Sequence, residues 1–204
     1  MVKHVSITQN SNIWRTILYS LIIVLYLIPL ILIFNSGYDS FFQLLRRVAG
    51  LTGIVSLFIA ILLSLLVRQS RRIFGIAYLR IHHFFSIAGL LLISLHPAII
   101  AIDFGTTRIL IPDLSSWDSF LTNAGRSALY IIYIAAIAAI MRRNIAKYWR
   151  FLHALVYLAF VLGAVHGMRQ GSDLSNPIIS ILFSTMIATI TVIFFYKRVL
   201  TGKK

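Results

Sequence analysis

Long apolar stretches alternate with short polar connections along the whole chain. Six stretches are long enough, at roughly 20 residues, to cross a bilayer as helices. They cover residues 17–34, 48–67, 81–102, 124–141, 151–168 and 177–196. The pattern predicts an all-α fold, a polytopic membrane protein built as a six-transmembrane-helix bundle. The fourth stretch is the weakest, because only 15 residues separate Arg126 from Arg142.

The connections between these stretches are too short to form a second domain. We therefore expect a single membrane domain over residues 1–204. The first stretch is longer than the apolar region of a typical signal peptide, and no small-residue cleavage pattern follows Phe34. We expect it to be retained as a membrane helix.

Composition agrees with the membrane prediction. Apolar residues make up 59% of the chain and charged residues 12%, about half the charged fraction of soluble domains. The mean hydropathy is +0.91. The chain has no cysteine, which excludes disulfides, thiolate metal sites, iron–sulfur clusters and covalent c-type haem attachment. The five acidic residues are all aspartates, so carboxylate-rich metal sites are poorly supplied.

The net charge of +14 would indicate a nucleic-acid partner in a soluble protein. Here the charges divide between the two sides of the predicted bundle. One side has five cations and all five aspartates, and is neutral. The other side, which includes both termini, has no acid and these cations: Lys3, Arg15, Arg68, Arg71, Arg72, Arg80, Arg142, Arg143, Lys147, Arg150, Lys197, Arg198, Lys203 and Lys204. The positive-inside rule then predicts that both termini are cytoplasmic, and no nucleic-acid partner is needed.

Five of the six histidines lie within the predicted spans, where ionisable residues are costly and usually functional. His82 and His96 are 14 residues apart on the third span, and His153 and His166 are 13 apart on the fifth. These intervals correspond to rises of about 20 Å along a helix. The two spans run in the same direction, so the first histidines can face each other and so can the second. Two bis-imidazole sites suit b-type haem, for which imidazole is a common axial ligand.

Helical geometry fits the two pairs unequally. Fourteen residues return to within about 40° of the same face, which favours His82 over the neighbouring His83 as the partner of His96. Thirteen residues leave about 140°, so the fifth span would need a distortion or a tilt relative to the haem. Gly163 and Gly167 flank His166 and would permit either, or would serve as small residues for close helix packing.

At these residues the chain resembles the ferric reductase-like transmembrane domain superfamily. The resemblance rests on the six spans, the histidine pairs His82/His96 and His153/His166, the segment RFLHALVYLAFVLGAVHG and the GRSAL sequence from Gly125. Within that superfamily it looks most like the MsrQ-type haem-binding subunit of the methionine sulfoxide reductase system. That group does not always have a histidine at the position of His82, so the general two-haem ferric reductase pattern fits equally well.

The resemblance implies an electron-transfer subunit rather than a complete enzyme, located in the bacterial inner membrane. About eight residues follow Tyr196, and no glycine-rich dinucleotide motif is present. Electrons would therefore come from a cytoplasmic flavin reductase or from membrane quinol. The acceptor implied is a periplasmic molybdopterin-containing reductase that repairs methionine sulfoxide. The number of b-type haems, one or two, stays open, and so does the binding of an additional FMN or quinone.

Several side chains near the histidines have two interpretations. Arg80 and Arg150 lie just before His82 and His153 and are candidates to contact the haem propionates, or to snorkel at the interface. Arg46, Arg47 and Arg126 are weaker candidates on the opposite side. The basic segments 68–72 and 142–150 would dock an acidic flavoprotein or attract anionic membrane lipid. Phe160 lies midway between His153 and His166, placed to separate two haems or to pack.

Two other functions stay open from the sequence. One is a stand-alone ferric or quinone-linked transmembrane reductase with no dedicated periplasmic partner. The other is a small transporter or proton channel that uses the histidines as a relay. The lack of intramembrane carboxylates weighs against the second.

Overall fold

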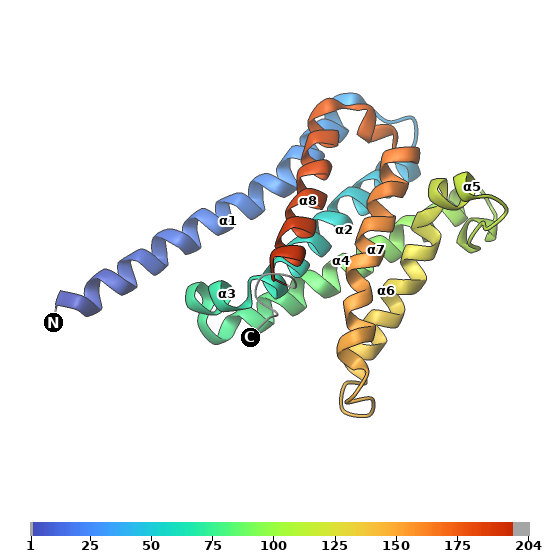
Figure 1. Ribbon diagram of the computed structural model, residues 1–204. Coiled ribbons are helices and arrows are strands. Elements are labelled where there is room, and N and C mark those ends of the chain that lie inside the picture. Colours follow the sequence, from blue (N-terminus) through green and yellow to red (C-terminus); the bar gives the residue numbers. More distant parts are fainter. Residues whose placement is uncertain (1, 198–204) are drawn as a thin grey trace.

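The computed structural model describes residues 2–197, with side chains from residue 12 onward apart from Ile76. These residues form an all-helical chain without β-strands (Figure 1). The six longer helices are α1 (Val2–Ser36), α2 (Phe41–Leu65), α4 (Tyr78–Asp103), α6 (Ala124–Ile140), α7 (Trp149–Gln170) and α8 (Pro177–Phe195). The shorter elements are α3 (Val67–Phe74), η1 (Gly75–Ala77), η2 (Arg108–Leu110), α5 (Trp117–Thr122) and η3 (Ser172–Ser175).

Five of the described helices are long and apolar enough to cross a membrane: Asn12–Ser36 of α1, and all of α2, α4, α7 and α8. The chain is therefore a multi-pass helical membrane protein by length and composition. The fourth predicted span is the shorter helix α6, with 17 residues. It spans about 26 Å, against a hydrocarbon core of about 30 Å. α5 precedes it directly, and the two helices meet at Asn123.

The connections gather at two ends of the molecule (Figure 1). The segments 66–77 and 141–148 lie at one end, which we call the basic end, together with the end of α8. The segments 37–40, 104–123 and 171–176 lie at the other, which we call the mixed end. The three sequence regions with acidic residues thus meet at the mixed end, as the alternation of spans predicts.

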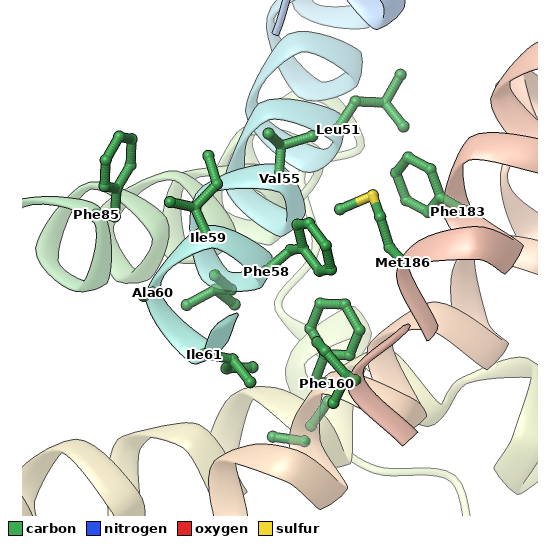
Figure 2. Close-up of a cluster of buried hydrophobic side chains, with 14 of the residues drawn as sticks. Leu51, Val55, Phe58, Ile59, Ala60, Ile61, Phe85, Phe160, Phe183 and Met186 are labelled. Atoms are coloured by element: carbon green, nitrogen blue, oxygen red, sulfur yellow. The ribbon is translucent and has the colours of Figure 1, made fainter. Parts of the chain in front are cut away.

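α2 is the central helix of the bundle. It packs against α1, α4, α7 and α8, and it is buried along most of its length, whereas α1 and α4 expose long apolar faces. Figure 2 shows its side chains among those of α7 and α8: Leu51, Val55 and Phe58 face Phe160, Phe183 and Met186. The rings of Phe58 and Phe160 pack with centroids 6.5 Å apart. Phe160 therefore has a packing role in the core.

A largely buried ion pair ties α2 to the connection before α8. The Nε of Arg47 donates to Oδ1 of Asp173 over 2.9 Å, and the side chains expose only 11% and 8% of their surface. Arg47 also donates to the Gly37 carbonyl and the Ser36 hydroxyl. This network joins α1, α2 and η3 at the mixed end.

Asp173→Ala is expected to lower the free energy of unfolding by about 3 kcal/mol, because removing one partner leaves the Arg47 guanidinium buried without its counter-charge. Denaturant or thermal unfolding in detergent measures the change. The matched control is Asp118→Ala, since Asp118 pairs with Arg169 while 81% of its side chain is exposed. That control is expected to show no measurable loss, because exposed ion pairs contribute little. Equal losses in both variants would contradict the prediction.

Candidate functional site

Two helix pairs make up the part of the bundle that holds the four predicted histidines. α2 packs along α4, and α6 packs along α7. α4 supplies His82 and His96, and α7 supplies His153 and His166. In each pair the two helices lie side by side in space, and only shorter elements or a loop separate them in the chain (Figure 1).

Each of the four imidazoles is hydrogen-bonded to a backbone carbonyl. For the histidines of α4 the carbonyls belong to α2, and for those of α7 they belong to α5 and α6. On α4, Nδ1 of His82 donates to Ala60 O over 3.0 Å, and Nδ1 of His96 donates to Arg46 O over 2.8 Å. On α7, Nδ1 of His153 donates to Ala135 O over 3.1 Å, and Nδ1 of His166 to Thr122 O over 2.8 Å. A carbonyl only accepts, so the proton sits on Nδ1 in every ring. In the neutral imidazole each Nε2 then keeps its lone pair.

The acceptors repeat the spacing of the donors. Arg46 and Ala60 are 14 residues apart, like His82 and His96. Thr122 and Ala135 are 13 apart, like His153 and His166. For α4 and α2 this correspondence is what two antiparallel helices in fixed register produce. The two histidines of α7 reach acceptors on consecutive elements, Thr122 at the end of α5 and Ala135 in α6. α7 is a continuous α-helix over both positions, so of the two alternatives predicted from the 13-residue interval the tilt relative to the haem remains.

His82 lies within electrostatic range of His153, and His96 lies within electrostatic range of His166. The two combinations are about 20 Å apart along the helices. His82 and His153 lie toward the basic end, and His96 and His166 toward the mixed end. Among the described residues, no three histidine, aspartate or glutamate side chains gather as a metal-ion cluster.

A cavity of about 450 Å³ lies between the two helix pairs toward the mixed end. His96 and His166 line it from opposite pairs, and Phe160 and Gly163 line it from α7. A Cβ built on Gly163 meets nothing within 4 Å, so this glycine faces open space rather than a closely packed helix. The predicted close-packing role of Gly163 is therefore wrong. At Gly167 a Cβ would make ordinary contact with Leu174, at 3.9 Å.

Three arginines also line this cavity. Arg46 pairs with Asp103 over 3.0 Å, and Arg47 is held by Asp173 as described above. Arg126 donates to the Ile111 carbonyl over 2.9 Å. Asp113 lies within electrostatic range of Arg126; its pKa is lowered by hydrogen bonds from the side chain and backbone of Ser115 and, less strongly, by Arg126. The cavity therefore has a cationic rim whose positive charge is partly balanced.

The residues at the basic end are more exposed. His83 is exposed, and its ring contacts that of His82 with centroids 5.7 Å apart. Arg80 and Arg150 are exposed near the beginnings of α4 and α7. The guanidinium of Arg150 lies over the Trp149 ring, 5.7 Å from its centroid. The Trp149 ring in turn lies 6.3 Å from that of His153.

Sequence reasoning missed the carbonyl acceptors and one polar link between the helix pairs. The Tyr133 hydroxyl of α6 donates to the Ser94 hydroxyl of α4 over 2.7 Å. Ser94 lies two residues before His96, so a polar contact near that histidine could have been predicted. A backbone carbonyl acceptor, in contrast, has no signature in the sequence.

Comparisons of the chain with protein-family models, with curated proteins and with solved structures give no match. The functional argument therefore depends on the residues of the site.

Proposed function

We propose that this protein is a b-type haem membrane subunit that passes electrons across the bilayer. The observation that carries the proposal is the common state of the four histidines. Each Nδ1–H is fixed on a carbonyl, and each Nε2 keeps a lone pair, which is how metal-ligating histidines are usually oriented. His82 with His153, and His96 with His166, would be the axial ligands of two haems.

The surroundings of the mixed-end pair fit a haem. A largely apolar cavity separates the two histidines, and ligand sites of this size are common for organic cofactors. Arg126 at its rim would neutralise the propionates there, and Arg80 and Arg150 would do so at the basic end. Haem iron supplies a one-electron Fe(III)/Fe(II) couple, while the protein supplies ligation, orientation and a low-dielectric shell. The two sites would lie toward opposite faces of the membrane.

Charge gives the direction of transfer. We infer six spans, with α5 and α6 together completing the fourth, and a cytoplasmic basic end. Electrons would enter at His82 and His153 from a cytoplasmic flavin reductase or quinol. They would leave at His96 and His166 for a periplasmic reductase; the MsrQ resemblance implies that this is a molybdopterin enzyme repairing methionine sulfoxide. A stand-alone ferric or quinone-linked reductase would use the same path with a soluble acceptor.

An absorption spectrum of the purified protein tests the proposal. We expect a Soret band that shifts on reduction with dithionite, and two haems per chain by pyridine haemochrome assay. In liposomes that enclose ferricyanide, external dithionite is expected to reduce it only when the protein is present, and His166→Ala is expected to abolish this. Protein without haem that moves protons would contradict the proposal and favour the histidine relay.

A further inference from the structure

Two glycines lie directly against the two histidines of the mixed-end pair. Gly50 of α2 is one turn from Arg46, whose carbonyl accepts from His96. Gly125 of α6 is three residues from Thr122, whose carbonyl accepts from His166. Both glycines also line the cavity. Three or four residues after each acceptor carbonyl, the chain therefore has a position without a side chain beside the ring.

The approach at Gly50 leaves no room for a methyl group. A Cβ built there would lie 2.9 Å from Nδ1 of His96 and 3.2 Å from Cε1. Contacts this short lie inside the van der Waals separation of carbon and nitrogen. The ring is also anchored to the Arg46 carbonyl on the same helix, so it would have to turn away from that carbonyl.

The approach at Gly125 is closer still. A Cβ there would lie 2.5 Å from Cδ2 of His166, 2.8 Å from Cγ and 2.9 Å from Nε2. Nε2 is the nitrogen left with a lone pair, so a methyl group at this position would crowd the atom that would face the iron.

We propose that Gly50 and Gly125 are positioning residues that let the His96 and His166 imidazoles lie directly against the neighbouring backbone, with Nδ1 bonded to the Arg46 and Thr122 carbonyls respectively. This inference rests on the proposed haem site for its functional meaning. The geometry itself concerns only residues of this chain, so it has its own test.

Gly53 supplies a matched control on the same helix as Gly50. A Cβ at Gly53 would lie 2.9 Å from Cγ2 of Ile93, the distance that Gly50 gives to His96. Gly53→Ala therefore crowds α2 against α4 by a similar amount without touching a histidine. It reports what loss of close helix packing does by itself.

The first experiment uses the haem-loaded protein. A haem iron with two histidine ligands has no free position for carbon monoxide. We expect Gly125→Ala, and to a smaller degree Gly50→Ala, to make one of the two haems bind carbon monoxide when reduced. In Gly53→Ala we expect neither haem to bind carbon monoxide. The inference would be overturned if neither Gly50→Ala nor Gly125→Ala bound carbon monoxide, or if Gly53→Ala bound it as well.

The second experiment uses full-length protein prepared without haem and labelled with ¹⁵N-histidine. Signals of His96 and His166 are assigned from His96→Gln and His166→Gln variants. In the unsubstituted protein both are expected as the Nδ1–H tautomer. Gly50→Ala is expected to change the His96 signal and Gly125→Ala the His166 signal, with neither changed in Gly53→Ala. If the glycine variants change nothing beyond Gly53→Ala, the positioning role is wrong, whatever the haem content. Absence of haem from the unsubstituted protein would instead count against the proposed function alone.

Discussion

His82→Ala is expected to lower the haem content of the purified protein from two per chain to one, whereas His83→Ala leaves it at two. The reason lies in the contacts of the two neighbouring rings. His82 is half-buried and anchored by Nδ1 to the Ala60 carbonyl. His83 is exposed, and its described contact is with the His82 ring. Pyridine haemochrome assays on both variants measure the difference.

These two variants control for each other. The substitutions are adjacent, remove the same side chain, and place the same good helix former near the beginning of α4. A loss of haem that came from damage to α4 would appear in both. Loss of one haem in His83→Ala with retention in His82→Ala would reverse the ligand assignment, and unchanged content in both would remove the basic-end site.

The Ser86 hydroxyl adds a detail to this expectation. It lies 3.5 Å from Nε2 of His82, at the outer limit of a hydrogen bond. A hydroxyl at that distance competes weakly with a metal for the lone pair. The hydroxyl can rotate, so Ser86→Ala is not expected to remove the haem.

The positions of the helices follow closely from the hydrophobic pattern. The predicted span 81–102 lies within α4, and 151–168 lies within α7. Apolar stretches of this length have few alternatives in a membrane, because backbone groups in lipid must be hydrogen-bonded within the helix. The pattern was less informative for α6, since Arg126 at its beginning shortens the apolar stretch.

The candidate site could be predicted only in part. The histidine intervals place two rings at each of two depths, because a helix has a fixed rise. The intervals do not say which way the rings point, and the angular argument for His153 and His166 considered α7 alone, without the carbonyls that bind the two rings. Thr122 at the end of α5 and Ala135 in α6 offer acceptors with the same 13-residue interval. Such a register depends on how two helices cross, which no single helix encodes.

The arginines show another limit of the sequence. Arg46, Arg47 and Arg126 looked equivalent as candidate propionate partners. The structure gives Arg46 and Arg47 aspartate partners that lie 57 and 126 residues away in the chain. Arg126 instead donates to the carbonyls of the connection before α5. Long-range pairing of this kind separates the three and makes Arg126 the best placed for an anionic group.

Gly163→Leu is expected to remove the mixed-end haem while making the haem-free protein more stable. Gly163 lies inside α7 and lines the cavity beside His166. Apart from the adjacent backbone of α7, no atom lies within 4 Å of the place where a Cβ would be. A leucine side chain would fill part of the space between His96 and His166. Haem content is expected to fall from two per chain to one.

The stability change should have the opposite sign. Glycine in a helix interior is less favourable than a good helix former by about 1 kcal/mol. Leucine would also fill part of an apolar cavity, and a smaller cavity destabilises the folded protein less. We therefore expect the free energy of unfolding of the haem-free protein to rise by about 1 kcal/mol, measured by denaturant unfolding in detergent.

The combination distinguishes a filled site from a damaged fold, because damage would lower haem content and stability together. Gly163→Ala adds one carbon atom and gains most of the helix propensity, so it should raise stability while keeping more haem than Gly163→Leu. Two haems retained in Gly163→Leu would mean that the space beside Gly163 is not the haem site. A haem-free Gly163→Leu protein less stable than the unsubstituted chain would mean that α7 packs against a neighbour at this position.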